Sequence, residues 1–399
     1  MPEHRHPGLG TTSVWAGEDE HLAQKPSAVP TVHSVSFDYE DVDQWLEVSL
    51  AKKRGYIYSR NTNPTVHAFE EKVRHLEGAE ATTSFSTGMA AISNTLFTLL
   101  SPGDRVVSLK DTYGGTSKIF LEFLPRFQID VVLCETTDHR AIESAVAEGC
   151  QALYLESPTN PTLKVIDLSR LATAGHEVGA TVIVDNTFAT PINQSPLELG
   201  VDLVIHSATK FLGGHADALG GVVCGPTELV ERIFHFREIN GASLHPMAAY
   251  LLLRGMKTLH LRIRQQNESA LEIAQYLEAH PSIERVFYPG LVSHEQHDIA
   301  KRQMRGYGGV LSFVLDGGFD AVRTFLPRLR YAHLAANLGA VDTIAGPPAT
   351  TSHVECTAEE REALGISESL VRYSVGIEDT EDLIADLEQA LARTAEPMP

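Results

Sequence analysis

The protein has 399 residues and a formal net charge of −20, with 43% hydrophobic and 21% charged residues. These values predict an ordinary globular protein with a large and a smaller domain, and they exclude collagen-like, disordered and small disulfide-rich classes. The acidic surface disfavours nucleic acid and anionic membrane surfaces as partners, because both are negatively charged.

The N-terminal segment, residues 1–60, predicts an arm with little regular structure. Its first residues, MPEHRHPGLGTTSVWAG, lack the apolar core of a signal peptide, and no apolar run in the chain is long enough to span a membrane. We therefore expect a cytoplasmic protein. The arm is rich in His, Pro, Thr and Asp, with one short predicted helix in DVDQWLEVSLAKK, and arms of this kind often pack on another subunit.

Residues 61–255 form the predicted large domain. From residue 82 to about residue 225, short β-branched runs alternate with amphipathic stretches of helical length. This alternation predicts βαβ units and a mainly parallel sheet that is covered on both faces. The runs are RVVSL, DVVLC, ALYLE, TVIVD and LVIHS.

Residues 256–399 predict a smaller α/β domain with some antiparallel pairing. The stretch from residue 256 to residue 280 is amphipathic, stops before Pro281 and predicts one long helix. The segments that follow predict strand, helix, strand, strand and helix, and they are VLSFVLDGG, FDAVRTFLPRL, the YAHLAANLG run, LVRYSVGIED and TEDLIADLEQALA.

Metal sites and disulfides are not expected. The H-x-x-H spacing of His294 and His297 does not suit a helical zinc site, and no C-x-x-C pair occurs. The four cysteines are too few and too scattered for a disulfide framework, and they are Cys134, Cys150, Cys224 and Cys356.

The strongest chemical signal is VIHSATKFLGGHADALGG, residues 204–221. A short buried run is followed there by Ser207, Thr209 and Lys210, and active-site groups of open α/β sheets gather at such strand ends. Lys210 is suited to a Schiff base with an aldehyde, and the two hydroxyls are suited to donate to a phosphate. Taken alone, S-x-T-K more often marks a surface lysine in a loop.

Two further segments suit a phosphorylated, cationic ligand. Asp185 closes the run TVIVD, one strand–connection–strand step before Lys210. A buried carboxylate needs a cationic partner or strong donors, and a protonated pyridine nitrogen is such a partner. Gly88 and Met89 open an apolar helix, whose free N–H groups favour an anion. Taken alone, an aspartate such as Asp185 is more often a loop or cap residue. A glycine such as Gly88 is as often needed for packing at a helix start as for an anion site.

Two other residues complete the constellation. Tyr113 lies in a glycine turn after a strand-like run and could stack on a flat heterocycle, although ordinary turn aromatics are commoner. Arg372 lies on a β-like run and can bind a carboxylate as a fork, although structural ion pairs are commoner. Together, these residues predict a pyridoxal phosphate (PLP) site that acts on an amino acid.

At these residues the sequence resembles the Cys/Met metabolism family of PLP enzymes, which includes cystathionine γ-lyase, cystathionine γ-synthase and methionine γ-lyase. The resemblance covers nearly the whole chain after the first ten residues. It implies an aspartate-aminotransferase-like α/β fold (fold type I) with an N-terminal arm, a PLP-binding domain and a C-terminal domain, assembled as a homotetramer of tight dimers. The motifs that carry it are YSRNTNPT, STGMAA, TYGGT, ESPTNP, VDNTFATP, HSATKFLGGHAD, YLLLRGMKTL and VRYSVGIED.

The resemblance implies a role for each candidate residue. Lys210 is the Schiff-base lysine, which carries PLP as an internal aldimine and moves protons, and Asp185 is the partner of the pyridine nitrogen. Tyr113 stacks on the ring and assists departure of the γ substituent. Asn160 binds the phenolic oxygen of the ring, and Arg372 holds the substrate α-carboxylate. The implied phosphate binders are Gly88, Met89, Ser207 and Thr209, with the partner subunit's Tyr58 and the partner subunit's Arg60.

The departures from the family concern the substrate. Gly115 stands where methionine γ-lyases usually carry cysteine, which disfavours methionine. Lys118 stands where cystathionine enzymes commonly have arginine. A positive charge for a distal carboxylate of the substrate therefore persists, but without the two parallel N–H donors of a guanidinium. Asn337 replaces a serine that normally helps bind the α-carboxylate. The other departures are Asp342 in place of glutamate and Thr351-Ser352-His353 in place of M-T-H.

We therefore expect γ-elimination from a γ-substituted L-amino acid, with cystathionine as the default substrate. The alternatives are γ-replacement on an activated homoserine with a thiol, which uses the same residues, and methionine γ-lyase activity. Lys210 and Asp185 disfavour a non-catalytic protein that has kept the fold, and Arg372 disfavours a sugar aminotransferase.

Overall fold

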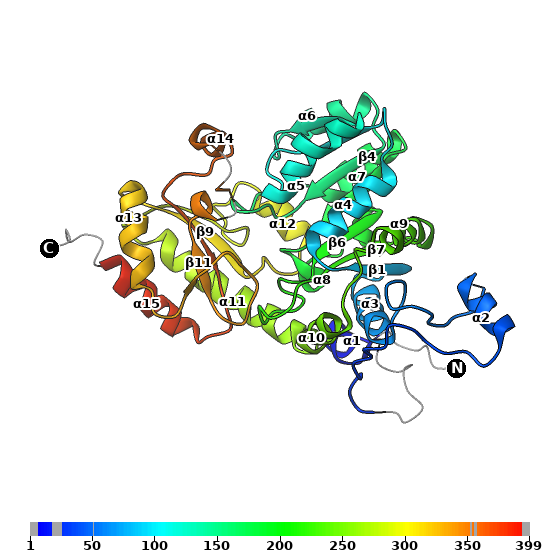
Figure 1. Cartoon of the computed structure of the whole chain (residues 1–399). Helices are drawn as coiled ribbons and strands as arrows, with labels where there is room; N and C mark the ends of the chain where they lie inside the picture. Colours follow the sequence, from blue (N-terminus) through cyan, green and yellow to red (C-terminus); the bar gives the residue numbers. More distant parts are fainter. Residues whose placement is uncertain (1–6, 18–25, 51, 352, 355–356, 393–399) are drawn as a thin grey trace, which may run out of the picture.

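The computed structural model describes residues 7–17, 26–50, 52–351, 353–354 and 357–392 (Figure 1). Ser352 and Cys356 lie outside the described residues. The strands are β1 (Ala81–Phe85), β2 (Arg105–Leu109), β3 (Asp130–Cys134), β4 (Ala152–Glu156), β5 (Thr181–Asp185), β6 (Leu203–Ser207), β7 (Gly221–Gly225), β8 (Ile283–Phe287), β9 (Val310–Leu315), β10 (His333–Leu334), β11 (Ile344–Gly346) and β12 (Leu370–Ser374).

The α-helices surround two sheets. They are α1 (Leu9–Trp15), α2 (Val42–Ser49), α3 (Pro64–Glu77), α4 (Gly88–Leu99), α5 (Gly114–Lys118), α6 (His139–Ala147), α7 (Leu168–Glu177), α8 (Thr190–Asn193), α9 (Thr227–Asn240), α10 (Pro246–Met256), α11 (Leu259–Glu278), α12 (His297–Gln303), α13 (Gly318–Phe325), α14 (Ala358–Ala363) and α15 (Thr380–Ala392).

The larger sheet has seven strands in the order β1-β7-β6-β5-β4-β2-β3. Strands β6, β5, β4, β2 and β3 run parallel, while β7 is antiparallel to β6 and β1. Val182 and Val184 of β5 join one apolar cluster and Ile183 joins another, so the clusters lie on opposite faces of the sheet. Both faces are thus covered by helices, which explains why the five predicted apolar runs, now β2 to β6, lack polar alternation.

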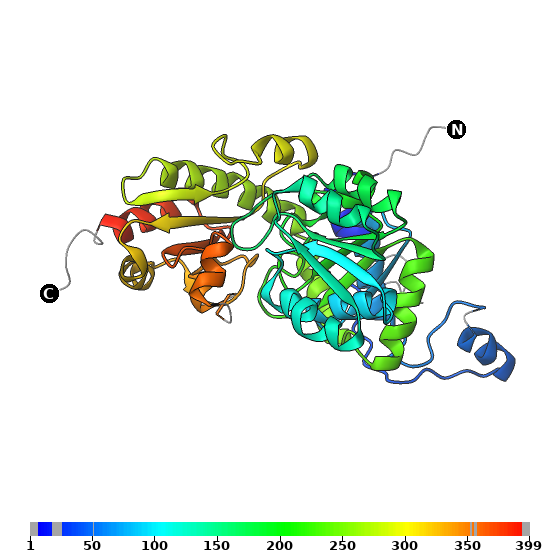
Figure 2. The same ribbon diagram turned by 90° about the horizontal axis from the view of Figure 1, so that it is seen from above.

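The smaller sheet has five strands in the order β10-β11-β12-β9-β8, and β12 is antiparallel to both of its neighbours. Helices α11, α13 and α15 bury apolar side chains against it. In both ribbon views this unit lies beside the larger sheet (Figures 1 and 2). The mainly parallel sheet and the smaller α/β unit are therefore confirmed, while the domain limits at residues 60 and 255 stay predictions.

Two predicted elements differ in the structure. The long helix after residue 256 begins at Leu259, because α10 ends at Met256 and the chain turns before α11. The predicted strand over residues 331–339 is reduced to the two-residue β10. The chain leaves the sheet after β10 and reaches Gly339, where φ is +76° and a Cβ would lie 2.7 Å from the Phe211 nitrogen. This close approach brings the segment to the loop that carries Lys210.

The N-terminal arm projects from the large sheet in both ribbon views, with α2 at its far end (Figures 1 and 2). Exposed apolar side chains lie on α2 at Val42, Trp45 and Leu46, and directly after it at Leu50. The packing of this arm on another subunit stays a prediction.

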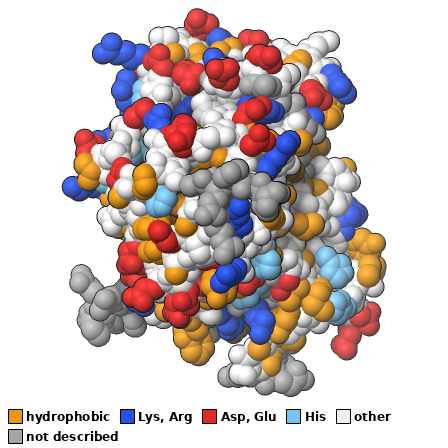
Figure 3. Space-filling model, turned by 90° about the vertical axis from the view of Figure 1, so that its left-hand side faces the viewer, with side chains coloured by type: hydrophobic (Ala, Val, Ile, Leu, Met, Phe, Trp, Pro, Cys, Tyr) orange, Lys and Arg blue, Asp and Glu red, His pale blue; other side chains and the backbone are white. Residues whose placement is uncertain are grey.

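Charged side chains are mixed on the face that Figure 3 shows, where acidic and basic groups are interspersed. Among the described residues, no helix is both long enough and apolar enough to cross a membrane.

Candidate active site

A cavity of about 280 Å³ opens at the carboxyl ends of β4, β5 and β6, beside the amino end of α4. It is lined by Thr87, Gly88, Met89, Ile92, Tyr113, Glu156, Pro158, Asn160, Asp185, Thr187, Phe188, Ser207, Thr209, Lys210, Leu219, Ala336, Leu338, Thr351 and Arg372. Nine of the thirteen residues predicted for the site are in this lining. The other four are Tyr58, Arg60, Lys118 and Asn337.

Lys210 lies just beyond β6, in the loop that lines the cavity. Its Nζ donates to Asn337 Oδ1 at 2.7 Å, so the structure joins Asn337 to the site through the lysine. Burial, together with the nearby charge of Arg372, lowers the pKa of Lys210 to about 8. Such an amine is partly neutral near neutral pH, and only the neutral amine attacks an aldehyde or accepts a proton.

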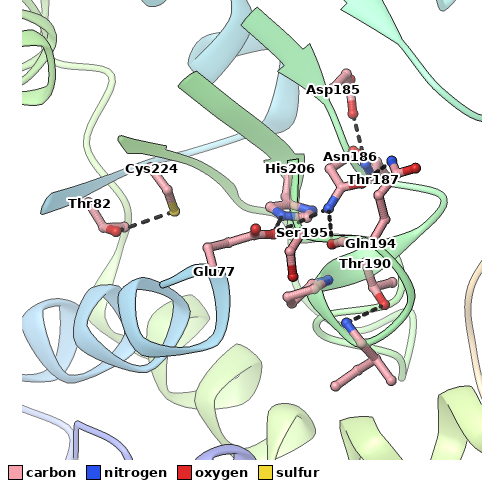
Figure 4. A network of polar contacts seen from close by, with 12 residues as sticks. Glu77, Thr82, Asp185, Asn186, Thr187, Thr190, Gln194, Ser195, His206 and Cys224 are labelled. Atoms are coloured by element: carbon pink, nitrogen blue, oxygen red, sulfur yellow. Dashed lines mark hydrogen bonds and ion pairs between the residues drawn. The ribbon is translucent and has the colours of Figure 1, made fainter. Parts of the chain in front are cut away.

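Asp185 ends β5 and is buried at the cavity wall. Burial raises the pKa of Asp185, and the hydrogen bonds from Thr187 and the nearby His206 lower it in part. The backbone N–H of Thr187 donates to Asp185 Oδ1 at 3.0 Å (Figure 4). Because burial penalises the negative charge, a cation bound against Asp185 would be strongly favoured.

Glu156 and Thr187 line the cavity but were missed by the sequence analysis. Glu156 ends β4 directly beside Asp185, and it accepts from the backbone N–H groups of Tyr113 at 2.8 Å and Asn160 at 3.3 Å. Burial and the neighbouring Asp185 raise the pKa of Glu156 well above its usual range. Glu156 could have been predicted from the sequence, because it ends the buried run ALYLE and begins the motif ESPTNP.

The amino end of α4 forms an anion site with the end of β6. N–H groups in the first turn of a helix have no partner within the helix, so those of Gly88 and Met89, which line the cavity, are available as donors. A Cβ at position 88 would lie 2.7 Å from Ser207 Cβ, so glycine lets the two backbones approach. The hydroxyl of Thr209, in contrast, exchanges hydrogen bonds with the Gly220 backbone at 3.0 and 3.3 Å.

Arg372 reaches the cavity from β12 of the smaller sheet. Its Nη1 donates to Asn160 Oδ1 and its Nη2 to the backbone oxygen of Asn337, both at 3.0 Å. Burial lowers the pKa of Arg372 to about 10, so the guanidinium remains a cation at neutral pH. Neither bond involves a carboxylate, and a fixed, buried cation of this kind suits a carboxylate ligand.

Three predicted residues lie apart from the cavity lining. Lys118 is at the end of α5, with its Nζ 3.9 Å from Glu122 Oε1. Arg60 stacks over the ring of Tyr58 at 5.6 Å and donates to the backbone oxygen of Glu238. Their expected roles therefore stay predictions, and for Tyr58 and Arg60 they concern the cavity of a partner subunit.

The comparisons with known proteins agree with this geometry. Residues 10–392 match the family model described as Cys/Met metabolism PLP-dependent enzyme. The chain belongs to this family. It is 43% identical to an L-methionine gamma-lyase of Fusobacterium nucleatum subsp. polymorphum, over 97% of this chain and 98% of that protein. It is also 43% identical to a cystathionine gamma-lyase of Dictyostelium discoideum, over 96% and 97% of the two chains.

Solved structures confirm the fold of this Cys/Met metabolism enzyme. A cystathionine gamma synthase from Xanthomonas oryzae pv. oryzae, in complex with aminoacrylate and cysteine, has a TM-score of 0.93 and 38% identity, over 98% of this chain and 99% of that one. The predicted α/β fold of type I is therefore confirmed, as is dependence on PLP.

The residues in the cavity fit PLP. The buried carboxylate of Asp185 lacks a cationic side chain bonded to it among the described residues, and the ring nitrogen of PLP supplies one. The N–H donors at Gly88 suit the phosphate, and the amine of Lys210, with its lowered pKa, suits the aldehyde. The sequence thus predicted groups that the structure brings together in this cavity, and their contacts with PLP stay predictions.

Proposed function

We propose that this enzyme catalyses γ-elimination on an L-α-amino acid with a sulfur substituent at Cγ. The observation that carries the proposal is the position of Lys210 in one cavity with Arg372 and Asp185. A cation for the substrate carboxylate, an amine for proton transfer and a carboxylate for the ring nitrogen thus face one ligand volume. Bound PLP supplies an electron sink for the charge that develops at the substrate Cα.

In this proposal Arg372 binds and orients the substrate. The bonds from its Nη1 and Nη2 to Asn160 and Asn337 fix the guanidinium plane before substrate arrives, so little reorganisation is needed on binding. Asn160 also lines the cavity, and we assign it to the phenolic oxygen of the ring. The side chain of Asn337 faces Lys210 rather than a carboxylate.

Lys210 is the proposed proton carrier. Its pKa of about 8 leaves part of the amine neutral near neutral pH, so it can accept the Cα proton and return a proton elsewhere on the substrate. When the amine is protonated, the oxygen of Asn337 at 2.7 Å accepts one of its hydrogens and holds it in the cavity. Asp185 would keep the ring nitrogen of bound PLP cationic, and Tyr113 would stack on the ring and assist departure of the leaving group.

The remaining assignments concern the phosphate. We assign Gly88, Met89, Ser207 and Thr209 to it from within the subunit. We assign the partner subunit's Tyr58 and the partner subunit's Arg60 to the same phosphate, in a homotetramer built from dimers. Arg60 and Tyr58 are available as one cation–aromatic unit on the outer surface of each chain.

The leaving group is proposed to be a thioether or thiol with little charge near Cγ. The cavity lining includes the apolar residues Met89, Phe188, Leu219 and Leu338, and it does not include Lys118. This favours a compact sulfur substituent, while cystathionine remains a candidate substrate through the named relative of that specificity.

A second candidate is γ-replacement, in which a thiol displaces the substituent of an activated homoserine. It is favoured by the high structural similarity to the cystathionine gamma synthase, at a TM-score of 0.93. The same binding and proton-transfer residues serve both reactions, so products must decide between them.

The test is a substrate panel with products identified by mass spectrometry. Methionine, homocysteine, cystathionine and O-acetyl- or O-succinyl-homoserine are supplied with and without cysteine. Release of 2-oxobutyrate, little changed by cysteine, supports elimination. A thioether formed from the homoserine ester at a higher rate than any keto acid would replace the first proposal with the second.

A further inference from the structure

A buried polar network lies beside the ends of β5 and β6, next to residues that line the cavity (Figure 4). Its centre is Glu77, the last residue of α3, whose Oε1 accepts from His206 Nε2 at 2.5 Å and from Asn186 Nδ2 at 3.4 Å. Gln194 Nε2 donates to Asn186 Oδ1 at 2.9 Å and to the backbone oxygen of Ser157 at 3.0 Å. All five residues are buried.

Each strand end that faces the cavity is held by this network. Side chains alternate between the two faces of a strand, so a residue that faces the cavity is followed or preceded by one that faces away. Asp185 is followed by Asn186, and Ser207 is preceded by His206. Glu77 thus contacts Asn186 and His206. These are the chain neighbours of Asp185 and Ser207, which we assign to the ring nitrogen and the phosphate of PLP.

Direct bonds link the same two strand ends. The Asn186 N–H donates to the backbone oxygen of Ile205 at 2.9 Å, and the Ser207 N–H donates to Thr187 Oγ1 at 2.9 Å. Glu77 adds a side-chain anchor from α3 to this pair of strand ends. Glu77 is therefore linked to both Asp185 and Ser207 through their neighbours in the chain, Asn186 and His206.

Two polar atoms of the network have no hydrogen-bond partner among the described residues. Glu77 Oε2 and His206 Nδ1 are buried and make no hydrogen bond within the described part of the chain. Burying polar atoms without partners costs stability, and such atoms in a native protein call for an explanation.

We propose that Glu77 is a positioning residue for the cofactor site, which sets the spacing between Asp185 and Ser207 through Asn186 and His206. Asp185 would hold the ring nitrogen of PLP and Ser207 its phosphate, so the affinity for PLP would depend on that spacing. The inference rests on the proposed assignment of Asp185 and Ser207 to PLP.

The test compares PLP affinity with the stability of the chain itself. The full-length protein is stripped of PLP, and equilibrium dialysis gives the Kd for added PLP while thermal unfolding is followed with and without it. Glu77→Ala removes the anchor, and Glu77→Gln keeps an acceptor oxygen of the same reach. Asp386→Asn is the matched control, because Asp386 is a buried carboxylate of α15 that accepts from the backbone N–H groups of Arg330 and Tyr331.

We expect Glu77→Ala to weaken PLP binding about tenfold, by analogy with residues that orient metal ligands, whose loss weakens metal binding about 10- to 100-fold. Glu77→Gln should restore the Kd to within about threefold of the original, because its oxygen can still accept both hydrogen bonds. Asp386→Asn should lower the unfolding temperature and leave the PLP Kd unchanged. If Glu77→Ala does not fold, Gln194→Met removes the next link at similar volume, and a several-fold weaker Kd is expected.

Three results would overturn the inference while leaving the proposed function intact. One is an unchanged PLP Kd in a folded Glu77→Ala or Gln194→Met variant. Another is an equal loss in Asp386→Asn, which would indicate a general effect of stability. The third is a Kd for Glu77→Gln as weak as that for Glu77→Ala, which would assign the effect to charge. Failure of the unsubstituted chain to bind PLP would instead refute the proposed function.

Discussion

Replacing Arg372 perturbs both substrate binding and the titration of Lys210. Arg372 is 7% exposed and is held at 3.0 Å by both Asn160 and the Asn337 backbone. Arg372→Met keeps a similar length but removes the charge, and Arg372→Lys keeps the charge but not the fork. Truncating one partner of a buried, hydrogen-bonded charge pair costs about 2–5 kcal/mol. For Arg372→Met this predicts a decrease in kcat/KM of between about 30-fold and several thousand-fold.

The same substitution shifts the pKa of Lys210 in a direction that the structure fixes. The Arg372 cation disfavours the protonated amine and helps lower the pKa of Lys210 to about 8. Removing that charge in Arg372→Met should therefore raise the pKa, whereas Arg372→Lys should change it little. The free amine is titrated by measuring, against pH, the rate at which the PLP-free protein takes up PLP, because only the neutral amine reacts.

We expect the midpoint of that rate profile to lie near pH 8 in the unsubstituted protein and to move to higher pH in Arg372→Met. Thermal unfolding of each variant checks that the fold is intact. A midpoint that stays in place in Arg372→Met, or a kcat/KM within about threefold of the original, would refute the placement of Arg372 beside the lysine and the substrate.

Three further substitutions test other parts of the site. Lys210→Ala should retain the circular dichroism spectrum and abolish turnover, and near-normal turnover would contradict its assignment. Asp185→Asn should lower kcat by about 10²–10³-fold, because a neutral amide no longer favours a cationic ring nitrogen, and an unchanged kcat measured at saturating substrate would oppose this role. Lys118→Ala should leave kcat/KM for methionine and cystathionine within about threefold, since an exposed ion pair with Glu122 contributes little; a larger loss with cystathionine alone would assign Lys118 to a distal carboxylate.

The sequence predicted the site best where a short apolar run, typical of a buried strand, ends in or just before a polar residue. The runs TVIVD and LVIHS are buried strands, and the residues at or just beyond their ends, Asp185 and Lys210, meet in one cavity. Parallel strands bring such residues to one edge regardless of the loops between them, so their convergence could be predicted. Two elements were harder to predict from the sequence. Strand β7 is GVVCG, with glycine at both ends, and helix α1 has only seven residues.

Contacts between distant segments could not be predicted from local patterns. The bond from Lys210 to Asn337 depends on the turn at Gly339, which brings the smaller unit to the lysine loop. The bond from Glu77 to His206 joins residues 129 positions apart through the end of α3. Such pairs carry no periodic signal, and they become visible only when the packing of α3 against the sheet is known.

Borohydride reduction of the PLP-loaded protein, followed by peptide mapping by mass spectrometry, tests the central claim most directly. We expect one pyridoxyl group per chain, located on Lys210, and no such group in Lys210→Ala. A pyridoxyl group on a different lysine, or a protein that binds PLP without any reducible link to Lys210, would contradict the proposed site.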